Sequence, residues 1–482
     1  FGAFFRLPLT NILKIQGIGI FQMIMALYSL TLGFVSTGVT NALSKLVSGA
    51  RARGEVSKIG GFYRYALIFS MGISLFLGII FIIFSKQISS LQGFSDASIS
   101  YMLLALLLPL GALIGTFRGI IQGYENMVPT AVSQIIEQAS KFAFGLFFAY
   151  LFGQNSISAG VFGAFLGITI SEVLAVLYLF FIIAVKIKIK VKSAPVRAQF
   201  FKAVLPLTFT GSVLPLASAI ESLTIVTLLS KAGLPQTTAT TLYGIQTGVV
   251  GAILHFPLII SLSVAMALLP KISFLSAKGQ IEDQQKIIKK AFGIMWFLLI
   301  PLVIGIISVS KIVFPIIYPT VVDGYMDIIY QLTVLGGFSI ALSALMQMIN
   351  AILQAKGFYN QSLLFNIIGA VFKIVTLVIF APVSAINIYA IPISNIVLYS
   401  IVCICGLIKL GSLVKVSFFS FALPLLSALI MFMIINIWLS YFSSVLGVIG
   451  AIVLGGIIYL VLCFPLLKEY ARDLIQKRRR AV

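Results

Sequence analysis

Acidic residues, histidine and cysteine are all scarce in this chain. Its 482 residues include 12 Asp and Glu, one His and three Cys. The cysteines, at positions 403, 405 and 463, all lie in apolar runs and form neither a disulfide framework nor a CxxC metal pair. The sequence also contains no P-loop, no HExxH and no paired-acid glycosyltransferase motif. We therefore expect no cofactor, no metal site and no ATP hydrolysis.

Hydrophobic residues make up 60% of the chain, and charged residues only 9%, against about 25% in a soluble protein. Apolar runs of 20 or more residues recur along the sequence, and that length spans a bilayer. The fold class predicted is an all-α polytopic membrane protein. We expect residues 1–13 to be the second half of a first helix, which makes about 14 spans with those near 19–44, 62–84, 99–122, 128–152, 159–185, 203–230, 239–269, 291–310, 328–354, 360–381, 385–408, 417–439 and 445–467.

The net charge of +21 is distributed in a way that indicates membrane topology rather than nucleic-acid binding. Alternate loops hold 26 of the 33 Lys and Arg residues, and the opposite loops hold only Lys14, Lys86, Lys231 and Lys311. Basic loops stay on the cytoplasmic side. The sequence therefore predicts an even number of spans with both termini cytoplasmic. It predicts no nucleic-acid partner, contacts with membrane lipids, and a monomer.

An internal sequence similarity predicts two similar halves. A shift of 232 residues brings Gln122 onto Gln354 and Lys141 onto Lys373. The predicted parts are an N-terminal six-helix bundle at 1–185, a basic cytoplasmic linker at 186–202 and a second bundle at 203–408. Two extra helices follow at 409–467, and a basic tail at 468–482. Because each half has six spans, we expect a parallel repeat with an axis along the membrane normal.

Few ionisable residues lie in or beside the apolar runs, and each is costly there unless it faces a partner or a cavity. These candidates are Arg6, Lys45, Arg118, Glu137, Lys141, Glu172, Glu221, His255 and Lys373. Glu137 and Lys141 have the i, i+4 spacing of an ion pair on one helix face. Glu172 on the next span would extend that pair into a polar cluster. The pair is either a self-neutralised structural feature or part of a function.

Arg6 is the strongest candidate for binding an anion, because a guanidinium binds phosphate with two hydrogen bonds and keeps its charge when desolvated. The alternatives are a pair with Glu221 or capping by carbonyl groups near Pro8. Lys373 needs an acidic partner, a carbonyl cage or an anionic ligand, whereas Arg118 is close enough to the interface to snorkel.

Two further residues are candidates for ion coupling. A carboxylate such as Glu221 in an apolar site binds a proton or Na⁺. His255 either carries a proton or packs through a hydrogen bond. The sequence His-Phe-Pro at 255–257 predicts a break in its helix.

Four segments resemble the multidrug/oligosaccharidyl-lipid/polysaccharide (MOP) flippase superfamily. They are FGAFFRLPLTNIL (1–13), NALSKLVSGARARGE (41–55), RGIIQGYENMVPTAVSQIIEQASK (118–141) and SVAMALLPKIS (263–273). The similarity is greatest to the stage V sporulation protein B-like branch, which includes MurJ-type lipid II flippases. It implies a bacterial cytoplasmic membrane protein with two six-helix bundles, and two C-terminal helices that border a groove for a lipid tail.

The resemblance also implies a substrate, an undecaprenyl-pyrophosphate-linked sugar moved from the inner to the outer leaflet by alternating access. Arg6 matches an arginine in the first helix of the MurJ-type proteins, and with Arg118, Lys45 and Lys373 it is expected to bind the pyrophosphate. The sequence has Phe21-Gln22 and the stretch 252–255 where those proteins carry an acid and an arginine. Two alternatives remain: a cation-coupled drug exporter of the same superfamily, and a membrane ligase or polymerase acting on polyprenyl-linked sugars.

Overall fold

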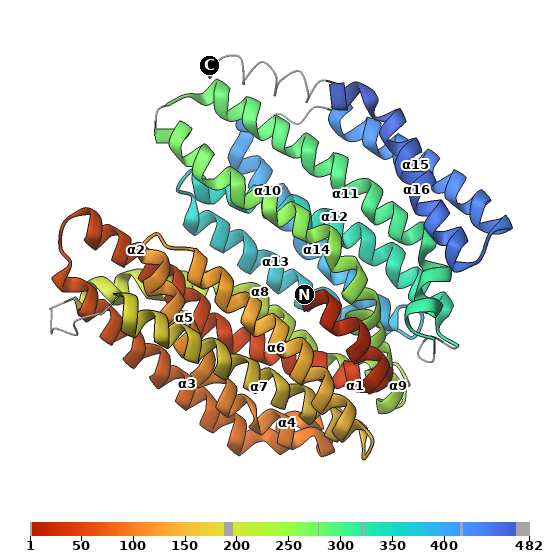
Figure 1. Cartoon of the computed structure of the whole chain (residues 1–482). Helices are drawn as coiled ribbons and strands as arrows, with labels where there is room; N and C mark the ends of the chain where they lie inside the picture. The colour runs from red at the N-terminus through yellow and green to blue at the C-terminus, as the bar shows by residue number, and fades with distance from the viewer. Residues whose placement is uncertain are drawn as a thin grey trace. The chain divides into compact units, whose positions relative to one another are not determined.

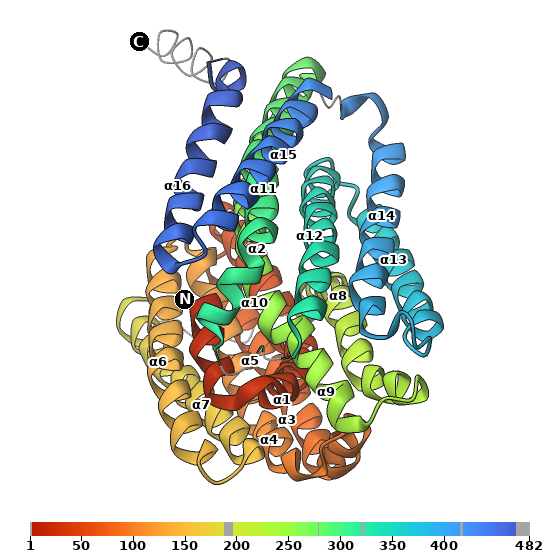
Figure 2. The same cartoon turned by 90° about the vertical axis from the view of Figure 1, so that its right-hand side faces the viewer.

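The computed structural model describes residues 2–187, 196–277, 279–319, 322, 324–414 and 418–468. Within these ranges every regular element is a helix (Figures 1 and 2). The predicted basic tail after Lys468 and residues 188–195 of the predicted linker lie outside the described residues. The α-helices are α1 (Gly2–Leu32), α2 (Gly38–Ala52), α3 (Ser57–Leu91), α4 (Ser98–Met102), α5 (Leu104–Gly123), α6 (Val128–Gly153), α7 (Ile157–Ile182), α8 (Arg197–Lys231), α9 (Gln236–Gly244), α10 (Gly251–Ala277), α11 (Ile281–Ile317), α12 (Met326–Ala355), α13 (Tyr359–Phe380), α14 (Ala390–Leu410), α15 (Phe418–Tyr441) and α16 (Val445–Leu462).

Short helices of other types interrupt or extend these elements. The π-helices are η1 (Gly33–Thr37), η3 (Ile183–Ile187) and η4 (Ile245–Val250), and the 3₁₀-helices are η2 (Ser95–Ala97), η5 (Asn387–Tyr389) and η6 (Gly411–Leu413). In hydrocarbon a chain must satisfy its backbone hydrogen bonds internally, so long apolar runs fold as helices. The described residues contain 13 helices long and apolar enough to cross a membrane. The predicted multi-pass, all-helical class is thus confirmed.

The first of these 13 candidate spans, Phe4–Ala52, contains the predicted span at 19–44 and most of the predicted partial helix at 1–13. They meet at Lys14, an exposed residue with φ 59°, where α1 kinks. This left-handed conformation is unfavourable for a residue with a side chain. The break between the two predicted segments is therefore a kink of one residue rather than a loop.

The described chain divides into two compact units. The first contains residues up to Val249 together with Leu377–Ile388, and the second contains Val250–Thr376 and Tyr389 onward. Helices α8 and α9 thus belong with the first unit. The division predicted at 186–202 rested on charge and on the internal sequence similarity, and it stays a prediction. The parallel repeat also stays a prediction.

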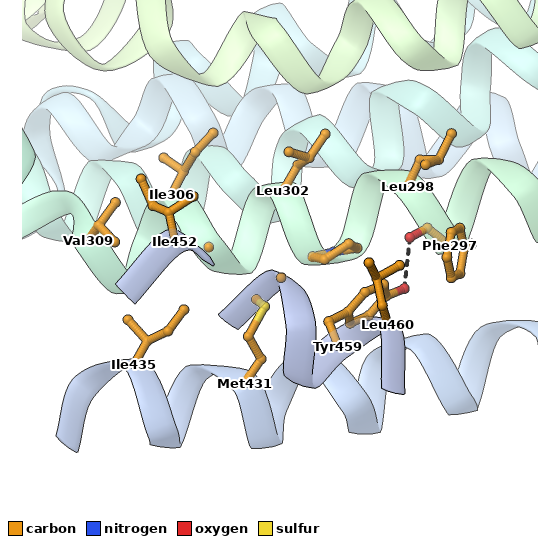
Figure 3. Close-up of a pocket in the computed structure, with 13 residues that line it drawn as sticks. Phe297, Leu298, Leu302, Ile306, Val309, Met431, Ile435, Ile452, Tyr459 and Leu460 are labelled. Carbon is orange, nitrogen blue, oxygen red and sulfur yellow. Dashed lines mark hydrogen bonds between the residues drawn. The ribbon is translucent and has the colours of Figure 1, made fainter. Parts of the chain in front are cut away.

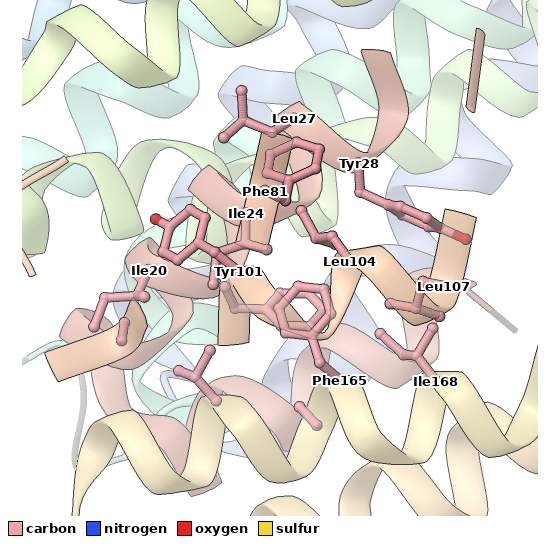
Figure 4. Packing of buried hydrophobic residues seen from close by; sticks show 14 of the residues in the cluster. Ile20, Ile24, Leu27, Tyr28, Phe81, Tyr101, Leu104, Leu107, Phe165 and Ile168 are labelled. Carbon is pink, nitrogen blue, oxygen red and sulfur yellow. The ribbon is translucent and has the colours of Figure 1, made fainter. Parts of the chain in front are cut away.

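Packing in the first unit centres on a buried cluster contributed by α1, α3, α4, α5 and α7 (Figure 4). Phe21 of α1 lies 5.0 Å from Phe165 of α7, centroid to centroid. Tyr101 and Leu104 are completely buried between these helices. Figure 4 shows Tyr28 at the edge of the cluster, with its hydroxyl pointing away from the apolar side chains.

Helices α6 and α7 approach each other through glycines. A Cβ added to Gly167 would lie 2.3 Å from the backbone nitrogen of Gly145, and one added to Gly163 would lie 2.2 Å from the carbonyl oxygen of Phe148. Small residues spaced four apart let two membrane helices touch backbone to backbone. This contact holds α7, and therefore Glu172, against α6.

Replacing Gly167 with alanine should force α6 and α7 apart, because the new methyl group would meet only backbone atoms that cannot turn away. Overpacking of this kind costs about 1–3 kcal/mol. We expect a clear loss of thermal stability in detergent. The control is Gly211→Ala in α8, where an added Cβ has no atom within 4 Å. Equal melting temperatures for the two variants would contradict the close contact.

The second unit carries its own intramembrane polar contact, between α12 and α13. The side-chain oxygen of Asn350 accepts hydrogen bonds from Ser362 at 2.8 Å and from the amide of Asn366 at 3.2 Å. Helices α15 and α16 pack along α11 of the same unit (Figure 2), where the Tyr459 hydroxyl donates to the carbonyl oxygen of Phe297 at 2.7 Å. This arrangement places the two C-terminal helices beside a helix of the second unit.

Candidate functional site

The hairpin between α5 and α6 turns within a few residues. Glu125 has φ 61°, and the side-chain oxygen of Asn126 accepts a hydrogen bond from the backbone N–H of Val128 at 3.3 Å. Pro129 then opens α6, where a missing N–H costs no helical hydrogen bond. The turn fixes the register of the two helices and so places polar residues of α5 opposite those of α6.

Arg118 of α5 and Glu137 of α6 form an ion pair across this hairpin. The Arg118 Nη2 lies 2.8 Å from Glu137 Oε2, and its Nε donates to the Ser133 hydroxyl at 3.0 Å. The two side chains are only 15% and 22% exposed. The ion pair predicted between Glu137 and Lys141 is therefore not the one formed, because the guanidinium reaches across the helices and offers two donors to α6.

Lys141 lies one turn beyond Glu137 and faces α1 instead. Its ammonium is 5.2 Å from the centre of the Phe5 ring, a cation–π distance. The charges of Glu137, Arg6 and Glu172 all act on it. Lys141 thus links the ion pair of the hairpin to the first residues of α1.

Arg6 is half-buried in the segment of α1 that precedes the kink at Lys14. Its backbone carbonyl accepts a hydrogen bond from the Thr10 hydroxyl at 2.8 Å, one turn later. Its neighbour Phe5 is 2% exposed and carries the contact to Lys141. The buried phenyl ring anchors this part of α1 and so positions Arg6.

Glu172 of α7 completes the group. It is 6% exposed, and its Oε1 accepts a hydrogen bond from the hydroxyl of Tyr28, which is 3% exposed. Electrostatic interactions connect Glu172 with Glu137, Lys141 and Arg118. We call these six residues the first-unit charge cluster: Arg6, Tyr28, Arg118, Glu137, Lys141 and Glu172. With three cations and two carboxylates, its formal charge is positive.

The remaining predicted site residues lie elsewhere. Lys45 is exposed on α2, and Glu221 is 6% exposed on α8, where its charge acts on Tyr243 of α9. Lys373 on α13 is 4% exposed and belongs to the second unit. His255, also in the second unit, is exposed, and its Nδ1 hydrogen-bonds the carbonyl oxygen of Gly251.

The predicted break at His255-Phe256-Pro257 is wrong. Helix α10 continues through Pro257 to Ala277, and the irregularity comes earlier, in the π-helix η4. Membrane helices tolerate proline because local changes of helix type and neighbouring groups satisfy the backbone groups it frees.

Lys45 lies about two helical turns before the end of α2, where a basic turn leads to α3. There Glu55 accepts hydrogen bonds from Lys58 at 2.8 Å and from Arg53 at 3.2 Å. These hydrogen bonds, with Lys58 contributing most, hold the pKa of the Glu55 carboxyl below its usual value. Arg51 lies over the Tyr124 ring at 4.8 Å and so connects this turn to the α5–α6 hairpin.

An apolar groove with a volume of about 470 Å³ lies in the second unit between α11, α15 and α16 (Figure 3). The Tyr459 hydroxyl in its wall is already bonded to Phe297, so the lining offers almost no free polar group. The groove suits an aliphatic chain. It is lined by Phe297, Leu298, Pro301, Leu302, Gly305, Ile306, Val309, Met431, Ile435, Ile452, Gly456, Tyr459 and Leu460.

Sequence reasoning missed Tyr28 and Phe5, whereas a groove beside the two C-terminal helices was expected from the resemblance. Tyr28 is a single hydroxyl-bearing residue within an apolar run, and its helical position alone does not reveal that it faces Glu172. Phe5 is adjacent to Arg6 in the sequence. An aromatic residue close to buried cations often makes a cation–π contact, and this signal could have identified Phe5.

Known structures with the same fold include the lipid II flippase MurJ in an inward closed conformation, with a TM-score of 0.72 and 16% identity over 98% of both chains. A multidrug resistance MATE family transporter of the MOP superfamily, inward-facing, has a TM-score of 0.66 and 14% identity over 85% of this chain and 94% of the other. The chain thus shares its fold with these two transporters.

Sequence comparison identifies the family. The profile of the polysaccharide biosynthesis protein family matches residues 1–276, and the chain belongs to this family. From Bacillus subtilis (strain 168), stage V sporulation protein B is 28% identical over 279 residues, and lipid II flippase MurJ is 26% identical over 345. These matches cover 56% and 64% of this chain, and the chain spans 54% and 61% of the two relatives' lengths. The predicted superfamily is confirmed.

Proposed function

We propose that this protein is a flippase that moves polyprenyl-pyrophosphate-linked sugars from the inner to the outer leaflet by alternating access. The observation that carries the proposal is the positive first-unit charge cluster, set among apolar helices of a chain from the polysaccharide biosynthesis protein family. The names of its relatives, a lipid II flippase among them, support a lipid-linked substrate. The site of action is the bacterial cytoplasmic membrane, with both termini cytoplasmic.

Such a substrate cannot cross hydrocarbon unaided, because its charged head would lose its hydration. Fixed cations inside the membrane replace that hydration. Arg6 is the residue proposed for the pyrophosphate, because a guanidinium binds phosphate oxygens with two parallel hydrogen bonds. Arg118 is already bonded to Glu137 and Ser133, so its proposed part is to add positive potential near the cytoplasmic end. Lys45 on the exposed face of α2 is proposed to attract the head, and Lys373 is a second candidate contact.

The apolar groove in the second unit is the site proposed for the lipid tail. Burial of apolar surface contributes roughly 25 cal/mol per Å², so even one isoprenoid unit in contact with these side chains adds measurable affinity. The groove wall contains two glycines, Gly305 and Gly456, that leave room beside α11 and α16.

Filling the groove gives a test of this tail site. Gly456→Leu is expected to lower the affinity for a long-chain polyprenyl pyrophosphate several-fold, because the new side chain takes up space that the tail would occupy. An added Cβ at Gly456 meets no atom within 4 Å, so the fold should survive. Gly72→Leu on α3, also with open space, is the matched control. Native mass spectrometry with bound lipid measures both, and unchanged binding by Gly456→Leu would rule out this groove.

The outward step has an energy source in the membrane potential. Carrying a negative head outward, and returning the positive empty site inward, is favoured by about 2.3 kcal/mol per charge per 100 mV. Glu221 and His255 remain proposed sites for a coupling proton or Na⁺, on the first and second units respectively.

A cation-coupled drug exporter is the second candidate, and the fold shared with the MATE family transporter favours it. The positive charge of the cluster opposes it, since most such drugs are cations. Export of a cationic dye from proteoliposomes, without flipping of a pyrophosphate lipid, would select this alternative.

A further inference from the structure

Glu172 is a buried carboxyl group with one oxygen satisfied and one not. Its Oε1 accepts the hydrogen bond from Tyr28, whereas Oε2 is fully enclosed and has no hydrogen-bond partner among the described residues. A buried polar atom without a partner is rare and needs an explanation. Oε2 is therefore the oxygen of this carboxyl group to which a proton can add while Oε1 keeps its hydrogen bond from Tyr28.

From this geometry we propose that Glu172 and Tyr28 form a proton-binding site, and that protonation of Glu172 and binding of the anionic head strengthen each other. In the step a proton from water adds to Oε2, the carboxylate becomes a neutral carboxylic acid, and Tyr28 keeps its bond to Oε1. This inference rests on the proposed function only for the coupling to the head. The proton site itself stands on the contacts of Glu172.

The groups around Glu172 explain why this site would bind a proton and not a metal cation. Tyr28 from α1 donates a hydrogen bond to it, and the charges of Arg118 from α5 and of Glu137 and Lys141 from α6 act on it. Helices η2 and α4, which also contact α7, bring Asp96, which is exposed, and Tyr101, which donates to Gln92. Sodium and other hard cations need several oxygen ligands. The surroundings do not supply them: Arg118 and Lys141 are cations, Tyr28 has one hydroxyl, and the oxygens of Glu137 accept hydrogen bonds from Arg118 and Gln138.

The coupling follows from the sign of the charges. Glu172 and Arg6 both act on Lys141, so all three belong to one electrostatic network in a medium of low dielectric constant. A protonated Glu172 removes one negative charge and leaves the cations more attractive to a pyrophosphate. By thermodynamic reciprocity, an arriving pyrophosphate makes the ionised carboxylate less favourable and draws a proton onto it.

Infrared spectroscopy of the full-length protein tests the proton site without any substrate. The wild type should show the carbonyl-stretch band of a buried protonated carboxyl group, which decreases as the pH is raised. Glu172→Gln, which keeps the acceptor for Tyr28, should lose this band. Glu125→Gln, at the exposed α5–α6 turn, is the matched control and should keep it. A band that persists in Glu172→Gln overturns the assignment, and one that responds to Na⁺ instead of pH does the same.

Binding of polyprenyl pyrophosphate at a series of pH values tests the coupling. Wild-type affinity should fall with rising pH, by about fivefold or more if the coupling is of ordinary size. Glu172→Gln should stay near the wild-type affinity at low pH. The ligand titrates equally with both proteins, so only the difference between them counts. Identical pH profiles overturn the coupling, whereas loss of all binding in both proteins overturns the proposed function and leaves the infrared result to decide the proton site.

Discussion

Arg6→Ala is expected to bind polyprenyl pyrophosphate about 30-fold more weakly than the wild type and to support little transport. A hydrogen bond to a charged group contributes roughly 2 kcal/mol, and each 1.4 kcal/mol is a tenfold change in affinity. The effect should be large because a head group inside the membrane has no water to replace the lost guanidinium. Equilibrium binding to the purified protein and growth complementation in cells measure it.

Two variants separate charge from structure at this position. Arg6→Lys keeps the charge but loses the paired hydrogen bonds, so it should retain part of the affinity. Arg64→Ala removes an exposed arginine on α3 and should bind like the wild type. If Arg6→Ala binds and transports normally while it folds normally, then Arg6 is a structural arginine and the head-group site is elsewhere.

Loss of the Arg118–Glu137 pair should have the largest effect on stability. Removing one partner of a buried ion pair costs about 3–5 kcal/mol, because the other charge is left in a medium of low dielectric constant. With the two side chains 15% and 22% exposed, we expect the lower end of that range for Arg118→Ala or Glu137→Ala. Thermal unfolding in detergent should show a lower melting temperature for each.

The double variant tells a direct pair from two independent effects. Arg118→Ala with Glu137→Ala leaves no unpaired charge, so it should be less destabilised than the sum of the single variants. Glu125→Ala, on the same hairpin but exposed, serves as the control. Strict additivity of the two single changes would mean that the two side chains do not act on one another.

The helices of this fold were largely predictable, because the bilayer sets both the length of the apolar runs and the position of the charged residues between them. The turn between α5 and α6, for example, lies in the short gap between the predicted spans 99–122 and 128–152. The type of helix was harder to predict from the sequence. The π-helix η4 and the continuous α10 replace the expected break at Pro257, because a membrane helix relieves proline by adjusting nearby backbone rather than by ending.

The sequence predicted most residues of the candidate site but not the contacts between them. Arg6, Arg118, Glu137, Lys141 and Glu172 were singled out because ionisable groups are rare in apolar runs. Which of these residues pair with each other was not predicted, because i, i+4 spacing describes contacts along one helix only. The bond from Arg118 to Glu137 crosses a hairpin.

Contacts between helices that are distant in the sequence were out of reach for the same reason. The Tyr28 hydroxyl contacts Glu172 across 144 positions, and α11 completes the groove that the resemblance implied beside the two C-terminal helices. A single sequence does not encode which faces of such helices meet, since nearly every face of a membrane helix is apolar.

Reconstitution into liposomes tests the central claim, flipping of a polyprenyl-pyrophosphate-linked sugar, most directly. A labelled lipid of this kind is placed in the bilayer, and an external reagent that modifies only outer-leaflet sugars reports its movement. We expect wild-type protein to make the inner pool accessible, Arg6→Ala to do so far more slowly, and empty liposomes not to do so at all. Movement that is no faster with wild-type protein than in empty liposomes would contradict this claim.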